Sequence, residues 1–306
     1  MGYSLVVSPA AVALVAIPTE VTWSYAVAGL VLATGLVAIF LRGEWRTEAK
    51  LDKLILFGPL FYAVPIAAFG TEHFTVTRGI ASIVPAWIPW HIFWVYLVGA
   101  CLIGAGFSLV TGIWVRLSAS LLALMFFLFV VLMDVPGCIR DPHNRFAITL
   151  ALRELSFCAG PLALAASLSQ QQSPRGARVA ATIARYFIAI PVLFYAIEQF
   201  LHADHVPGIP LEMVTPAWLF GHRLWTYLTA VIYAIAGVPL LVGKKTRTAA
   251  AWIGLTVLFV ILVVYVPIAV AERDSLEGLN YLFDTLMYCG TLLLLARAMP
   301  RSTQSR

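Results

Sequence analysis

The sequence has 306 residues, of which 61% are hydrophobic and only 11% are charged, with a mean hydropathy of +0.91. Soluble domains average about 45–50% apolar and about 25% charged residues, so this composition excludes an ordinary soluble protein. The net charge is +5, but the basic residues are dispersed among short loops. Such dispersal is typical of topology control and argues against a nucleic-acid partner. The composition predicts a polytopic protein in a lipid bilayer.

Nine apolar runs are long enough to cross the ~30 Å hydrocarbon core as helices of about 20 residues each. They cover residues 23–41, 54–70, 92–112, 117–135, 146–168, 179–201, 224–242, 249–270 and 279–298. We therefore expect an all-α polytopic membrane protein with about nine transmembrane helices. Residues 1–19 are apolar but lack the basic start of a signal peptide, and we expect them at the outer interface or against the bundle.

The distribution of lysine and arginine predicts the orientation. One set of loops, together with the C-terminal tail, contains fourteen of these residues, and the opposite set contains five. The richer side is expected to be cytoplasmic, which places the N-terminus outside and the C-terminus inside. We expect a multi-pass protein of a bacterial-type cytoplasmic (inner) membrane.

The chain contains an internal sequence repeat. Residues 85–96 read PAWIPWHIFWVY and residues 216–227 read PAWLFGHRLWTY, and twelve of the thirty-two positions from 85 to 116 recur 131 residues later. Each repeat contains four helices, and an even number of crossings returns the chain to the same side of the membrane. Both copies should therefore have the same orientation. The predicted parts are an N-terminal segment with an extra helix (1–53), a first four-helix unit (54–168), a linker (169–182), a second four-helix unit (183–299) and a tail (300–306).

The two units share four further features. They are an aromatic first helix (FGPLFYAV, IPVLFYAI), a loop ending in Pro-Ala-Trp, a short turn after the second helix (TGIWVR, VGKKTR) and a small-residue break in the last helix (FCAGPLALA, YCGTLLLLA). In these features each unit resembles a DoxX-type four-helix membrane domain. The family is named for a membrane subunit associated with thiosulfate:quinone oxidoreductase. The resemblance implies a quinone-linked membrane subunit with an extracytoplasmic redox partner.

All the histidines map to the predicted outer side, and so do the charges inside the spans. Arg153 and Glu154 lie about two turns into the fifth helix, Glu198 one turn from the outer end of the sixth, and Asp284 five residues into the ninth. Buried charges are costly in a bilayer and usually have partners. We expect Asp284 or Glu198 to pair with Arg153, and Glu154 not to, because adjacent helical residues diverge. The candidate catalytic residues are Glu198, His202, Arg153 and Asp284.

Two kinds of cofactor are compatible with these residues. Glu198, His202 and His205 share one helix face, and they could ligate a transition metal or pass protons to a quinone. The wider set of candidate metal ligands is His202, His205, Glu198, His73, His91 and His222. The aromatic residues that could flank a quinone ring are Tyr62, Tyr195, Trp94 and Trp225. The alternative is structural, because histidines at helix ends commonly bind water, lipid or backbone, and the Arg153 group could clamp the two units together.

Three functions remain open from the sequence. The first is a quinone-interacting subunit of a membrane redox system, although the chain has no haem, flavin or iron–sulfur motif. The second is a non-enzymatic membrane scaffold or assembly factor. The third is a transporter of a metal or small molecule, although few charged groups lie in the cytoplasmic halves of the spans. The four cysteines form no CxxC pair, which argues against disulfide exchange.

Overall fold

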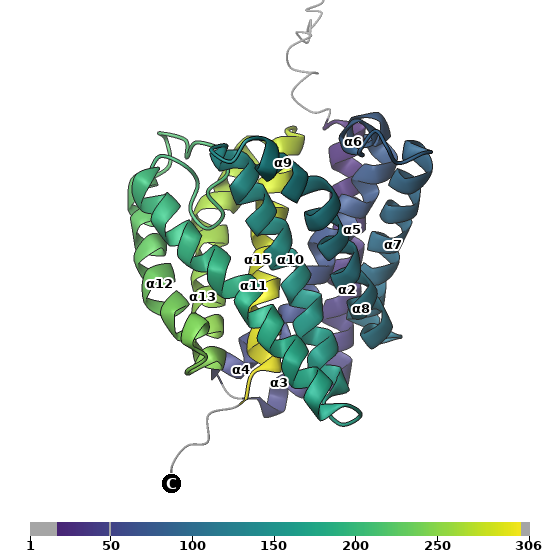
Figure 1. Cartoon of the computed structure of the whole chain (residues 1–306), viewed down its shortest axis with the longest axis vertical. Helices are drawn as coiled ribbons and strands as arrows, with labels where there is room; N and C mark the ends of the chain where they lie inside the picture. The colour runs from purple at the N-terminus through teal and green to yellow at the C-terminus, as the bar shows by residue number, and fades with distance from the viewer. Residues whose placement is uncertain (1–16, 49, 301–306) are drawn as a thin grey trace, which may run out of the picture.

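The computed structural model describes residues 17–48 and 50–300 and shows an all-α membrane protein (Figure 1). Within these residues nine helical segments are long and apolar enough to span a membrane, which confirms the predicted fold class. They cover Thr19–Arg42, Leu51–Thr75, His91–Thr111, Val115–Arg140, Arg145–Ser169, Pro174–Leu201, His222–Val242, Thr246–Ala271 and Leu276–Ala298. Most of the proposed interfacial segment 1–19 and of the tail 300–306 lies outside the described residues.

The first half of the chain contains α2 to α9. The helices are α2 (Thr19–Arg42), α3 (Glu44–Thr47), α4 (Lys50–Leu56), α5 (Gly58–Thr75), α6 (Thr77–Ile83), α7 (His91–Thr111), α8 (Val115–Phe129), the π-helical turn η1 (Val130–Asp134) and α9 (Val135–Arg140). Figure 1 shows α6 and α9 at one end of the bundle and α3 and α4 at the other. We name these the outer end and the inner end, after the predicted orientation.

The remaining helices complete the bundle. They are α10 (Arg145–Ser169), α11 (Pro174–Leu201), α12 (His222–Val242), α13 (Thr246–Val260), the π-helical turn η2 (Ile261–Tyr265), α14 (Val266–Ala271) and α15 (Leu276–Ala298). Each π turn is followed by a helix with proline in its first turn, at Pro136 and Pro267. Proline lacks the N–H that an α-helix requires and crowds the carbonyl of the preceding turn, so a local change of hydrogen bonding is expected there.

The helices recur with the same offset as the sequence repeat. Helix α12 begins and ends 131 residues after α7 (91 + 131 = 222; 111 + 131 = 242), and the same offset separates η2 from η1 and α14 from α9. A buried contact recurs as well, because the Cys158 thiol donates to the Ala123 carbonyl and the Cys289 thiol to the Gly254 carbonyl. The limits of the two predicted units, 54–168 and 183–299, stay a prediction.

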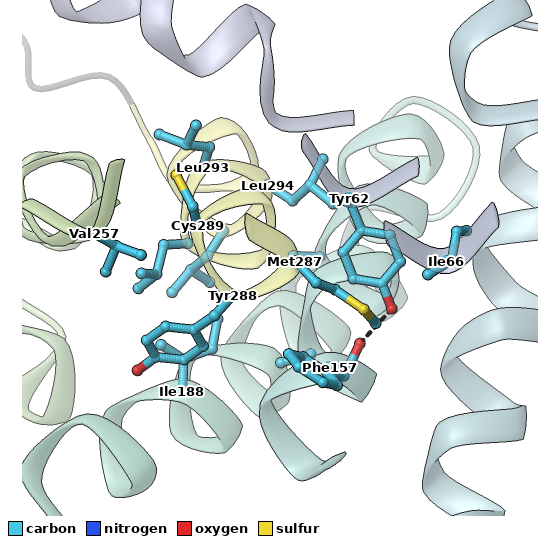
Figure 2. Close-up of a cluster of buried hydrophobic side chains, with 14 of the residues drawn as sticks. Tyr62, Ile66, Phe157, Ile188, Val257, Met287, Tyr288, Cys289, Leu293 and Leu294 are labelled. Carbon is cyan, nitrogen blue, oxygen red and sulfur yellow. Dashed lines mark hydrogen bonds between the residues drawn. The ribbon is translucent and has the colours of Figure 1, made fainter. Parts of the chain in front are cut away.

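The centre of the bundle is formed by α10 and α15, which pack against each other. The first helix of each predicted unit packs on the last helix of the other, α5 on α15 and α11 on α10. Close approach requires glycine here, since a Cβ at Gly290 would lie 2.5 Å from the Tyr62 backbone nitrogen. Figure 2 shows the core around α15, with the buried Tyr62 hydroxyl donating to the Phe157 carbonyl at 2.8 Å. Helix α2 packs on α5 and α7 at one side of this arrangement.

Candidate functional site

The predicted polar region in the outer half of the bundle contains an arginine held by two carboxylates. Arg153 donates to Asp284 at 2.5 Å and to Glu154 at 2.7 Å, and its guanidinium carbon lies 5.6 Å from the centre of the Phe157 ring. The pairing with Asp284 was predicted, whereas the expectation that Glu154 would not pair was wrong. The arginine side chain is long enough to fold back along α10, although the Cβ atoms of adjacent residues diverge.

Three further polar side chains, Glu72, Asp134 and Asn280, lie beside this group. Together with Arg153, Glu154 and Asp284 they form what we call the Arg153 cluster. Glu72 in α5 is buried, is hydrogen-bonded by the Asn280 side chain and lies within electrostatic range of Asp284. Asp134, the last residue of η1, lies within range of Arg153 and Glu154. Four different elements therefore supply the cluster.

The hydrogen bonding of the Arg153 cluster is incomplete. Among the described residues, buried oxygens without a partner include Glu72 Oε1, Asp134 Oδ2, Glu154 Oε2 and Asn280 Oδ1, and on the donor side Arg153 Nε also lacks a partner. Buried polar atoms are nearly always bonded, because an unmade hydrogen bond costs about 1–3 kcal/mol. The cluster thus has more free acceptors than free donors, and it is suited to a ligand or water molecules that donate hydrogen bonds.

The depth of the cluster follows from the two central helices. Arg153 lies eight residues after the start of α10 and Asp284 eight residues after the start of α15 (145 + 8 = 153; 276 + 8 = 284). At 1.5 Å per residue, both lie about 12 Å below the outer helix ends. Aromatic rings surround this level, with Phe283 in edge contact with both Tyr25 and Phe69.

A second polar group lies closer to the outer end, and we call it the Arg145 cluster: Arg145, Glu198, His202 and His205. Arg145 Nη1 lies 3.5 Å from Glu198 Oε2, Arg145 Nη2 lies 3.2 Å from His205 Nε2, and His202 Nε2 lies 3.8 Å from Glu198 Oε2. Burial first and the Arg145 charge second lower the pKa of His205 below its usual 6.5. Neutral His205 can therefore accept a hydrogen bond from Arg145.

The Arg145 side chain limits the kind of ligand that the Arg145 cluster can bind. A guanidinium between Glu198 and His205 places a fixed positive charge where a metal ion would have to bind. No group of three or more His, Cys, Asp or Glu side chains within residues 17–48 and 50–300 could hold a metal ion. The geometry favours an arginine-linked polar cluster over a metal site.

Arg145 also holds an inserted loop in place. Residues 206–211, between α11 and α12, are all buried, and Arg145 donates to the carbonyls of Pro210 and Leu211 at 2.7 and 2.9 Å. The Tyr265 hydroxyl donates to the Pro207 carbonyl at 2.7 Å, and the Tyr281 hydroxyl accepts from the Met213 amide at 2.8 Å. This buried loop closes the outer end beside α11, whereas the corresponding segment of the first half forms the exposed helix α6.

The other predicted site residues are spread over the molecule. Trp94 and Trp225 lie near the outer starts of α7 and α12, where each indole N–H donates to a carbonyl five residues earlier, at 3.1 and 2.8 Å. His91 and His222 are the first residues of the same helices, and His73 lies 2.7 Å from the Phe69 carbonyl. These contacts are structural, and the predicted roles in metal or cofactor binding stay predictions.

Tyr62 and Tyr195 are buried in the centre, with their hydroxyls directed to the carbonyls of Phe157 and Thr149. The Tyr195 ring packs edge-on against Tyr288, and the predicted role of both tyrosines beside a quinone ring stays a prediction. The predicted site residues did not include Glu72, Asp134, Asn280 or Arg145. Asp134 carried a usable signal, because it is the single acidic residue in the predicted span 117–135.

Comparisons of the chain with protein-family models, with curated proteins and with solved structures find no match.

Proposed function

We propose that this integral membrane protein binds a quinol, the reduced form of a membrane quinone, at the Arg153 cluster. The observation that carries the proposal is the surplus of buried acceptors, which are Glu72 Oε1, Asp134 Oδ2, Glu154 Oε2 and Asn280 Oδ1. A quinol presents two O–H donors, whereas a quinone presents only acceptors. Carboxylates can accept hydrogen bonds but, when ionised, cannot donate them.

The surroundings of the cluster fit the same class of ligand. The cluster lies about 12 Å below the outer helix ends, at a depth that a lipid-soluble ring reaches from the bilayer. Phe69, Phe157 and Phe283 provide aromatic surface beside the polar groups. The sequence resemblance to the DoxX-type domain points in the same direction, and it adds an extracytoplasmic partner protein that would exchange electrons with the bound quinol.

The test is the quinone content of the purified protein in its two redox states. Protein extracted from native-type membranes in mild detergent should retain quinone under reducing, oxygen-free conditions and lose most of it after oxidation. Glu72→Gln replaces one free acceptor with a group that also donates, so it should lower retention and reduce the preference for the reduced form. Glu212→Gln is the matched control, because Glu212 is an exposed acid of the outer loop.

Two results would reject the proposal. One is wild-type protein without quinone under both conditions. The other is equal retention by wild type and Glu72→Gln. A quinone-free protein that co-purifies with a stable partner would favour the scaffold function instead.

A further inference from the structure

A pocket of about 550 Å³ opens at the inner end, far from both polar clusters along the bundle. Its walls come from α2, α4, α5, α7, α8, α10 and α15, with Leu60, Leu109 and Leu164 on its apolar side. Gly35 also lines it, seven residues before Arg42 on α2, so the pocket extends about 10 Å into the bundle from the helix end. Its volume lies within the range of about 300–1,000 Å³ that is typical of ligand sites.

The polar part of the lining is positively charged. Arg42, Arg116 and Arg297 line the pocket, and no aspartate or glutamate does. Arg42 donates to the carbonyls of Val110 and Thr111 at the end of α7, and Arg116 donates to the neutral Gln172 side chain. Among the described residues Arg116 forms no ion pair with a carboxylate. Arg297 also lines a neighbouring pocket whose walls include Glu48 and Asp52. The pocket therefore combines three positively charged side chains with an apolar interior.

In the second half of the chain, the arginine at the equivalent position is paired with a carboxylate. Arg247 is the repeat partner of Arg116 (116 + 131 = 247), and it binds Asp52 at 2.5 Å and the Ala296 carbonyl at 2.9 Å. The same turn is thus neutralised by a carboxylate in one half and left without one in the other. The pocket with the apolar interior lies beside the uncompensated copy.

We propose that this pocket binds an anionic phospholipid, with the phosphate at Arg116 and Arg297 and part of one acyl chain along the leucine-lined wall. A guanidinium matches the geometry of phosphate oxygens and stays charged in an apolar setting. Basic pockets between transmembrane helices on the cytoplasmic side suit anionic lipid headgroups. The apolar interior distinguishes a lipid from free phosphate, because free phosphate would leave that wall without a ligand. This site is independent of the proposed quinol site.

The experiment compares two charge-matched double variants of the full-length protein in detergent. Arg116→Gln with Arg297→Gln removes two of the three pocket charges. Arg175→Gln with Arg178→Gln removes two exposed charges of the same end that do not line the pocket. Arg42 is left unchanged because it caps α7. Unfolding temperature and native mass spectrometry are recorded with phosphatidylglycerol, with phosphatidylcholine and with inorganic phosphate alone.

Phosphatidylglycerol should raise the unfolding temperature of wild type and of the control variant and should remain bound in the mass spectrum. The pocket variant should lose this effect, with binding weaker by about tenfold or more, since two charge-assisted contacts are removed. An equal effect of phosphatidylcholine, or equal losses in both double variants, would overturn the site. If inorganic phosphate alone had an equal effect, lipid binding would be rejected and the pocket would be a site for a free anion.

Discussion

The pairing of Arg153 with Asp284 joins the two central helices, so removing it tests both the fold and the proposed site. We consider three variants, Arg153→Met, Asp284→Leu and the double variant. Methionine and leucine keep most of the volume and remove the charge. Side-chain exposure is 17% for Arg153 and 9% for Asp284, so solvent screens the pair only weakly.

The expected costs differ because Glu154 is a second partner. In Arg153→Met both Glu154 and Asp284 lose their cation, and breaking a buried pair in this way costs about 3–5 kcal/mol. In Asp284→Leu the guanidinium keeps Glu154 at 2.7 Å, so the cost should be smaller, about 1–3 kcal/mol. The double variant leaves only Glu154 without its partner, and its cost should be below the sum of the single costs by about 1–3 kcal/mol.

The free energy of unfolding can be measured by denaturant titration in mixed micelles, with helix content as the signal. The double-mutant cycle then gives the coupling between positions 153 and 284. Additivity within about 0.5 kcal/mol would refute the direct ion pair. A larger cost for Asp284→Leu than for Arg153→Met would refute the role assigned to Glu154.

Three other predictions concern separate parts of the molecule. Burial lowers the pKa of His205, so on acidification the unfolded chain binds this proton before the folded protein does. Stability should therefore fall as the pH drops below about 6.5 and level off below the folded pKa. His205→Asn should flatten this part of the plot of unfolding temperature against pH, and an unchanged plot would contradict the assigned pKa shift. Gly290→Ala should destabilise the protein by about 1–3 kcal/mol or more, because the added Cβ meets the backbone of α5, whereas Gly104→Ala, with no atom within 4 Å, should be neutral or stabilising in the same thermal unfolding assay. In a cysteine-free background, Asp204→Cys should react with an impermeant thiol reagent from outside and Arg175→Cys only from inside, and the reverse pattern would invert the predicted topology.

The sequence was sufficient for the nine spans because each is a long apolar run, and burial in lipid leaves a helix as the available local structure. It also narrowed the partner of Arg153 to Asp284 or Glu198, since a buried charge needs an opposite one and few were available, but it did not choose between them and it wrongly excluded Glu154. It could not place Asp134 or Glu72 beside that pair. Their proximity depends on how four elements align along the bundle, and apolar composition carries no information on that register.

The buried loop 206–211 shows a similar limit. Its sequence, VPGIPL, indicates an irregular segment, and prolines at 207 and 210 remove two backbone donors. It is held by the Tyr265 hydroxyl and by Arg145 at the start of α10, and the Tyr281 hydroxyl binds the segment that follows, at Met213. None of these partners is close in sequence, so the inserted conformation could not be predicted from the segment itself.

Arg153 and Asp284 occupy the same position of the repeat (153 + 131 = 284), and each is eight residues into its helix. In a symmetric pair of identical units, a residue beside the twofold axis meets its own copy. Two arginines or two aspartates would then face each other, which costs about 4 kcal/mol at 4 Å and an effective dielectric constant of 20. An attractive pair at equivalent positions therefore requires two copies that can differ in sequence, as they do within one chain. The same freedom leaves Arg116 without a carboxylate while Arg247 binds Asp52. Both proposed ligand sites thus lie where the two halves of the chain have become different.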